Sequence, residues 1–288
     1  MGIMISNVQR MSFDDGPGVR TTVFLKGCSI ACPWCSNPEN IKFEKQCYYD
    51  KERCKKGDNF CIYNKDCILL KDNNMDLSKI ENTCPLNAVG YYGREYEAQE
   101  LVEELLKDQY FWGETGGVTF SGGEALLQTS ELIEVWKLLK EKNIHITVET
   151  ALFVPRAYVE QAVKYIDLFY VDLKILETQM CKEILGGNVE LYLQNVEYLS
   201  CCGKEIVFRI PCVKEYVLRE ENWEKICDFL CSYTQYPAQI FAVHDLGKKK
   251  YQTLGYHFQE FERLSNEQLE KYSEDLKQVG CSVEIIQI

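Results

Sequence analysis

Six short apolar segments alternate with amphipathic helical patterns along most of this 288-residue chain. Parallel strands need long crossover connections, usually helices, so the alternation predicts an α/β fold with a parallel sheet. In an open sheet or a barrel of this kind, binding sites lie at the carboxyl ends of the strands. The expected strands are Thr21–Leu25, Gly117–Phe120, His145–Glu149, Leu168–Lys174, Glu205–Arg209 and Gln239–Val243. The expected helices include Ala98–Tyr110, Ser130–Lys142, Pro155–Tyr165, Glu221–Tyr233 and Asn266–Val279.

Fifteen cysteines are the most unusual feature of the composition. No apolar run reaches the roughly 18 residues of a membrane span, and the N-terminus MGIMISNVQR lacks the order of a secretory signal, so we expect a cytoplasmic protein. An odd number of cysteines in that compartment favours metal-binding thiolates over disulfides. The net charge of −12 disfavours a nucleic-acid partner and favours a protein or small-molecule substrate.

Three of these cysteines form a C-x3-C-x2-C loop directly after the first expected strand: Cys28, Cys32 and Cys35. Three thiolates this close can bind three irons of a four-iron cluster and leave the fourth iron open. All three histidines of the chain lie far along the sequence, so a zinc site with four protein ligands is the weaker interpretation. Packing of free thiols does not explain such a density of cysteines in a loop. The loop therefore predicts a [4Fe-4S] cluster with an open iron.

The loop resembles the radical S-adenosylmethionine (SAM) motif, and its surroundings resemble the glycyl-radical-enzyme activating enzymes, such as pyruvate formate-lyase activating enzyme. The resemblance covers most of the chain. The matching segments are Phe13–Arg20, Cys28–Glu39, Gly116–Glu124, Asp172–Lys174 and His244–Tyr251. The resemblance implies a partial (β/α)6 barrel of the TIM type. It also implies that the open iron binds SAM, that one electron cleaves SAM to a 5′-deoxyadenosyl radical, and that this radical takes hydrogen from a backbone glycine of a partner enzyme.

The resemblance also assigns residues to SAM, and some of these have a physical reason of their own. Gly122 and Gly123 let a backbone approach a ligand closely, and Asp172 and Lys174 lie on the same face of a strand near its carboxyl end. The implied SAM-binding residues are Trp34, Cys35, Ser36, Gly122, Gly123, Glu124, Asp172, Leu173, Lys174 and His244. Glu149 and Thr150 end another expected strand and could reach the same site at the carboxyl ends of the strands. This chain departs from the family pattern at Ala125, at Val243 and after Pro211.

The segment from 46 to 88 has little periodicity and contains five more cysteines, Cys47, Cys54, Cys61, Cys67 and Cys84. It predicts a cysteine-rich, ferredoxin-like insert in a barrel made by residues 1–45 and 89–288. Related inserts carry two clusters on tight C-x2-C-x2-C-x3-C-P runs, which this chain lacks. The five cysteines can hold a second iron–sulfur cluster, a zinc ion or no metal, and these alternatives stay open. A second cluster would relay electrons or dock the partner.

Two other functions compete with the activating enzyme. A radical SAM enzyme acting on a small molecule would share the cluster and the SAM residues. A ferredoxin-like electron carrier would not cleave SAM. The activating enzyme implies a glycyl-radical enzyme as partner and flavodoxin or ferredoxin as electron donor. The remaining cysteines are interpreted as small core residues: Cys181, Cys201, Cys202, Cys212, Cys227, Cys231 and Cys281.

Overall fold

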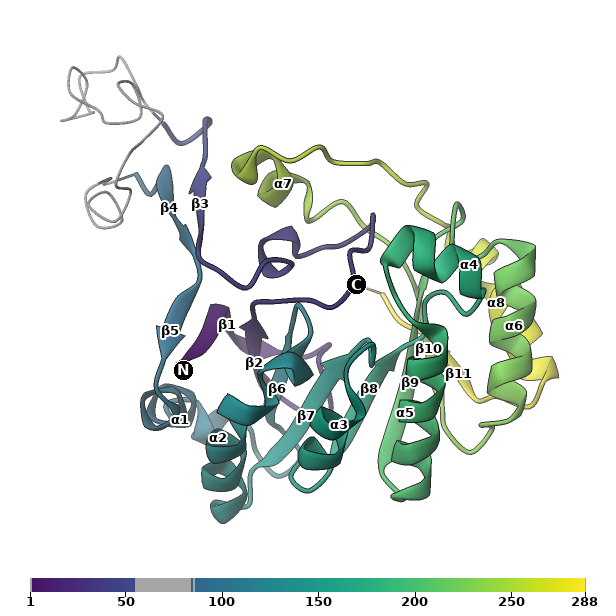
Figure 1. Ribbon diagram of the computed structural model, residues 1–288, viewed down its shortest axis with the longest axis horizontal. Coiled ribbons are helices and arrows are strands. Elements are labelled where there is room, and N and C mark those ends of the chain that lie inside the picture. Colours follow the sequence, from purple (N-terminus) through teal and green to yellow (C-terminus); the bar gives the residue numbers. More distant parts are fainter. Residues whose placement is uncertain (1, 55–83, 85, 288) are drawn as a thin grey trace.

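The structure, a computed structural model, describes residues 2–54, 84 and 86–287. Within them, one sheet of nine strands has the order β11-β10-β9-β8-β7-β6-β2-β1-β5 (Figure 1). The strands, in chain order, are β1 (Ile3–Ser12), β2 (Arg20–Leu25), β5 (Arg94–Tyr96), β6 (Gly117–Gly122), β7 (His145–Thr150), β8 (Leu168–Asp172), β9 (Glu205–Cys212), β10 (Ala238–Ala242) and β11 (Val283–Ile285).

In the sheet order from β11 to β2, every neighbouring pair of strands is parallel, whereas β1 pairs antiparallel with both β2 and β5. All six predicted strands are present, so the predicted α/β class with a parallel sheet is confirmed. The two edge strands, β5 and β11, do not pair with each other in the described part of the chain, which agrees with a partial barrel rather than a closed one. The carboxyl ends of the parallel strands consequently share one edge.

Most of the helices follow one another along the outside of this sheet (Figure 1), and consecutive ones such as α2 and α3 pack together, whereas α7 packs on the short helix Pro38–Asn40. Their bounds are α1 (Ala98–Leu106), α2 (Thr129–Glu141), α3 (Arg156–Ala162), α4 (Thr178–Met180), α5 (Val189–Cys201), α6 (Glu220–Cys231), α7 (Lys248–Leu254) and α8 (Asn266–Gln278). Short 3-10 helices cover Pro38–Asn40, Gln109–Phe111 and Ala125–Gln128, and a π-helical turn covers Cys181–Leu185. A capping box of Ser265 and Gln268 starts α8, since it satisfies backbone N–H groups that lack helical partners. No helix of the described residues is long and apolar enough to cross a membrane.

A buried arginine joins the amino-terminal ends of three neighbouring strands. The Arg20 side chain is fully buried, and its guanidinium donates to Thr119 Oγ1 and Thr147 Oγ1, each at 2.9 Å, and to the Val118 carbonyl at 2.6 Å. Burial lowers its pKa to about 10, so the guanidinium stays charged at neutral pH. These bonds join β2, β6 and β7 at the edge of the sheet formed by the amino-terminal ends of the strands, opposite their carboxyl ends.

The predicted insert starts and ends on a separate two-stranded antiparallel sheet. Its strands are β3 (Gln46–Tyr49) and β4 (Val89–Tyr92), and Cys47 lies on β3. Helix α7 packs against this pair, with Lys249 Nζ 3.1 Å from Asp50 Oδ2. Cys61 and Cys67 lie outside the described residues. The division of the chain at 46–88 therefore stays a prediction.

The interpretation of the remaining cysteines as core residues is wrong for three of them. Cys181, Cys212 and Cys281 are buried and Cys227 is half-buried, but Cys201, Cys202 and Cys231 are exposed. The exposed three lie at the carboxyl-terminal ends of α5 and α6, where Leu199 and Leu230 are buried instead. The three cysteines therefore lie off the buried faces of these helices.

Candidate functional site

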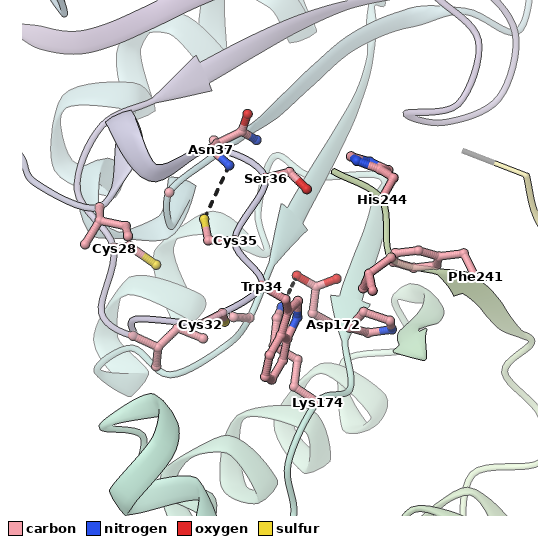
Figure 2. Close-up of a pocket in the computed structure, with 17 residues that line it drawn as sticks. Cys28, Cys32, Trp34, Cys35, Ser36, Asn37, Asp172, Lys174, Phe241 and His244 are labelled. Carbon is pink, nitrogen blue, oxygen red and sulfur yellow. Dashed lines mark hydrogen bonds and ion pairs between the residues drawn. The ribbon is translucent and has the colours of Figure 1, made fainter. Parts of the chain in front are cut away.

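One pocket lies at the carboxyl ends of the parallel strands, where the cysteine loop after β2 meets the residues that follow β6, β8 and β10 (Figure 2). Ten of the residues predicted for cluster or SAM line it: Cys28, Cys32, Trp34, Cys35, Ser36, Gly122, Gly123, Asp172, Lys174 and His244. These residues come from four segments far apart in sequence, and the parallel sheet brings them together. None of Cys47, Cys54 and Cys84 lines this pocket.

The cysteine loop is held in place by backbone hydrogen bonds at both of its ends. Gly27 N donates to Asn40 O at 2.8 Å, and Cys28 N donates to Ile41 O at 3.0 Å. At the other end Cys35 N donates to Cys32 O at 3.1 Å. The loop therefore presents its three sulfur atoms from a fixed backbone.

The chemistry of the three thiols fits a metal cluster. Burial raises the pKa of Cys28 to about 12, and it also raises the pKa values of Cys32 and Cys35. Without a metal these groups would therefore stay protonated, whereas iron binds the thiolate form. The Ser29 hydroxyl in the same loop is buried and has no hydrogen-bond partner among the described residues, so it can donate to a group held by the loop.

Single-ion coordination fits the site less well. In the part of the chain that the structure describes, no three His, Cys, Asp or Glu side chains converge on one metal ion. In a four-iron cluster each thiolate binds a different iron, so the sulfur atoms need not converge on one point. The three-cysteine loop is thus better suited to a cluster than to zinc.

The glycine turn after β6 packs directly on the cysteine loop. Gly122 has φ +113, and a Cβ on Gly123 would lie 2.2 Å from Gly27 O and 2.5 Å from Asn40 O. Gly123 N also donates to Leu25 O at 2.8 Å. Glycine is required at both positions because the backbones of the two loops touch and leave no room for a Cβ. Both glycines also line the pocket, so their backbone is open to a ligand.

The structure does not bring Glu124 and Leu173 into the pocket lining, although both were predicted to bind SAM. Leu173 is fully buried. The buried Glu124 carboxylate accepts hydrogen bonds from Thr150 Oγ1 at 2.7 Å and from Ala151 N at 2.8 Å. Burial raises the pKa of Glu124. Glu124 therefore joins the β6 turn to the end of β7, and Thr150 points to Glu124.

Two ion pairs lie in or beside the pocket, one between Lys174 and Asp172 and one between Arg209 and Glu149. Lys174 Nζ lies 2.5 Å from Asp172 Oδ2, and both residues line the pocket. Burial alone would lower the pKa of Lys174, but Asp172, Cys32 and Cys28 together outweigh burial and the pKa is raised. Nearby, Arg209 pairs with Glu149, which accepts a hydrogen bond from Ser121 Oγ at 2.5 Å. Burial raises the pKa of Glu149 to about 7.

An aromatic wall and a histidine complete the pocket. Phe241 of β10 lines it, and the Arg209 guanidinium lies 5.4 Å from the ring centroid of Phe241. Trp34 stacks on Tyr216 with ring centroids 5.5 Å apart. Burial, together with the charge of Arg263, lowers the pKa of His244, so this imidazole is neutral at neutral pH.

Sequence reasoning missed seven of the lining residues: Ile30, Asn37, Ile41, Ala151, Pro211, Phe241 and Val243. The two-residue period of a strand was the available signal for Phe241, since it places Phe241 and Val243 on one face. Ile30 and Ile41 belong to loops without such a period. Their positions follow from the fold of the cysteine loop alone.

Comparisons with known proteins identify the class of protein that has this fold and this pocket. The family model described as the radical SAM superfamily matches residues 22–230, and the chain belongs to this superfamily. Within it, the chain belongs with the activating enzymes. It is 35% identical to the trans-4-hydroxy-L-proline dehydratase activating enzyme of Clostridioides difficile, over 94% of this chain and 95% of that protein. It is 30% identical to the pyruvate formate-lyase 2-activating enzyme of Escherichia coli, over 87% of this chain and 80% of that protein.

Solved structures share the fold. A domain of pyruvate-formate lyase-activating enzyme from Bacteroides vulgatus matches with a TM-score of 0.50 and 25% identity, covering 60% of this chain and 99% of that one. A radical SAM methyltransferase from Sphaerobacter thermophilus matches with a TM-score of 0.60 and 13% identity, covering 97% of this chain and 68% of that one. The second likeness concerns the fold alone.

Proposed function

We propose that this protein activates a glycyl-radical enzyme by radical SAM chemistry. The observation that carries the proposal is the pocket in which the Cys28, Cys32 and Cys35 loop faces the Gly122–Gly123 turn, the Asp172–Lys174 pair and His244. Relatives at 30% and 35% identity are named activating enzymes for different partners. The proposal therefore specifies the class of partner, a glycyl-radical enzyme.

Each part of the pocket has a role in the proposal. Cys28, Cys32 and Cys35 would hold a [4Fe-4S] cluster, and the cluster would supply the electron for reductive cleavage of SAM to a 5′-deoxyadenosyl radical. The glycine turn contacts the methionyl end of SAM through its backbone. The remaining positions, Trp34, Ser36, Asp172, Lys174 and His244, orient SAM and exclude water.

Asp172 and His244 suit a cationic ligand. SAM carries a positive sulfonium, and the Asp172 carboxylate, paired with Lys174, reduces the repulsion between that lysine and the sulfonium. A neutral His244 adds no further positive charge. Its Nδ1 accepts a hydrogen bond from Leu246 N at 3.3 Å, so Nε2 carries the proton and can donate to the ligand. The electrostatics of the pocket thus support SAM as the ligand.

For the insert we propose a second iron–sulfur cluster that relays electrons from flavodoxin or ferredoxin or docks the partner. Cys47 on β3 and Cys84 shortly before β4 are near the two ends of the segment, and β3 and β4 pair with each other. Iron and zinc analysis separates the alternatives. One cluster gives about four irons per chain and two give about eight, whereas a zinc site adds about one zinc.

The test is anaerobic. The chain is reconstituted with iron and sulfide, reduced and given SAM, and 5′-deoxyadenosine is measured in wild type, Cys32→Ala and Cys212→Ala. Cys212 is a buried cysteine outside the loop, so its variant controls for the loss of a thiol. We expect product from wild type and Cys212→Ala and none from Cys32→Ala. A reducible cluster in wild type without any product would contradict the enzyme and favour the electron carrier.

The partner is tested separately. Candidate glycyl-radical enzymes are added to the reduced protein with SAM, and electron paramagnetic resonance detects a glycyl radical on the partner. SAM cleavage that produces a radical on no glycyl-radical enzyme would favour a small-molecule substrate.

A further inference from the structure

Helix α7 places a lysine on the segment that follows the cysteine loop. Lys250 Nζ lies 2.6 Å from Asn37 Oδ1 and 2.6 Å from Glu39 Oε1. The Glu39 side chain is 5% exposed, so its charge is shielded from solvent. Lys250 therefore neutralises a buried carboxylate close to the cluster ligands.

Glu39 has few other contacts that could replace this ion pair. Its Oε2 is buried and has no hydrogen-bond partner in the described part of the protein. A buried lysine, Lys26, donates to the backbone carbonyl of Glu39 and attracts the carboxylate at longer range. Lys250 is the cation in direct contact with this carboxylate, and its loss would leave a buried charge without a direct partner, which is costly.

A short chain of hydrogen bonds connects this pair to a cluster ligand. The backbone N–H of Asn37 donates to Sγ of Cys35 at 3.4 Å (Figure 2), while the Asn37 side chain accepts from Lys250. Hydrogen bonds to the sulfur ligands and the net charge nearby set the reduction potential of an iron–sulfur cluster. Lys250 acts on both quantities.

We propose that Lys250 and Glu39 form a positioning pair that sets the reduction potential of the cluster held by Cys28, Cys32 and Cys35. The positive charge of Lys250 favours the reduced cluster, and the negative charge of Glu39 opposes it. Lys250 also holds Asn37 so that its N–H stays on Cys35. The inference rests on the proposed function, because it requires the cluster at this loop.

The experiment is a redox titration of the iron-loaded full chain, followed by electron paramagnetic resonance of the reduced cluster. In Lys250→Met we expect the ratio of reduced to oxidised cluster at a fixed potential to fall about tenfold, which is about 59 mV for a one-electron couple. In Glu39→Gln we expect a shift of similar size in the opposite direction. The double variant should return towards wild type.

Lys248→Met is the matched control. It removes a lysine from the same helix whose partner, Glu260, is exposed, so we expect no shift of the potential. Opposite signs for Lys250→Met and Glu39→Gln would not result from a general loosening of the fold, since loosening affects both variants in the same way.

Iron content is measured first and separates the two proposals. Wild type that takes up no iron contradicts the proposed function. Normal iron in the variants with unchanged potentials, or with shifts of the same sign, overturns the positioning pair alone. Should Lys250→Met fail to retain iron, Glu39→Gln decides, and an unchanged or lowered potential in it overturns the inference.

Discussion

Lys174 and Asp172, two residues apart at the end of β8, form an ion pair of 2.5 Å between Nζ and Oδ2 inside the pocket. Asp172→Asn keeps the shape of the side chain and removes its charge, which leaves the Lys174 cation facing a cationic ligand. We expect the Kd for SAM to rise about tenfold, or about 1.4 kcal/mol. Equilibrium dialysis of the iron-loaded variant with labelled SAM measures this.

Glu160→Gln is the control for Asp172→Asn, because it removes an exposed carboxylate on α3. Its Kd for SAM should equal that of wild type. An unchanged Kd in Asp172→Asn at normal iron content would mean that the pair does not face SAM.

Gly123 is the tightest contact between the glycine turn and the cysteine loop. In Gly123→Ala the new Cβ would meet the carbonyl oxygens of Gly27 and Asn40, which belong to backbone and cannot move independently. We expect a loss of about 1–3 kcal/mol in the free energy of unfolding, together with reduced iron uptake. Chemical denaturation and iron analysis give both quantities.

Gly203→Ala provides the comparison for Gly123→Ala. Gly203 has φ +64, and a Cβ added there would meet no heavy atom of the described residues within 4 Å, so only backbone strain of about 1 kcal/mol is expected. Iron uptake should stay normal in this variant. Equal iron loss in both glycine variants would contradict the role assigned to the contact.

Patterns with strong local signals allowed much of the fold and the site to be predicted. The six predicted parallel strands have apolar cores bounded by turns, and the close spacing of Cys28, Cys32 and Cys35 is typical of cluster ligands. Parallel strands end at one edge, and the resemblance to the radical SAM family added the expectation that Asp172 and His244 lie beside the same loop. The pocket lining contains both.

What the sequence did not reveal depends on tertiary contacts. Strand β1 contains several polar residues, so it lacks the apolar signal of the other strands. Glu124 turns away from the pocket because Thr150 Oγ1 and Ala151 N, which are distant in sequence, donate hydrogen bonds to it. The pairing of Lys250 with Glu39 joins residues 211 positions apart, which no local pattern indicates.

The hydrogen bonds of Arg20 predict a large cost for its removal. Arg20→Met leaves the hydroxyls of Thr119 and Thr147 and the Val118 carbonyl without a buried charged donor. We expect a loss of about 3 kcal/mol or more in the free energy of unfolding, measured by chemical denaturation. In contrast, Arg156→Met removes an exposed ion pair with Glu160 and should cost about 1 kcal/mol or less. Similar losses in the two variants would contradict the importance of the buried network.

Glu149 predicts a specific dependence of stability on pH. Its pKa is raised to about 7 by burial, against an unfolded value of about 4.3. Between these values the folded chain binds more protons than the unfolded chain, so the contribution of Glu149 to stability decreases as the pH rises from about 4.5 to 7. The decrease should approach about 2 kcal/mol, less than the full shift implies because the carboxylate keeps some contact with solvent.

The measurement compares the free energies of unfolding of wild type and Glu149→Gln between pH 5 and 8, because the difference cancels the other titrating groups. Glu149→Gln should gain on wild type as the pH rises through this window, and the gain should level off above pH 7. The exposed control Glu160→Gln should show a constant difference from wild type. A constant difference for Glu149→Gln as well would mean that Arg209 offsets the burial of Glu149 completely, and the carboxylate would then be ionised throughout this range.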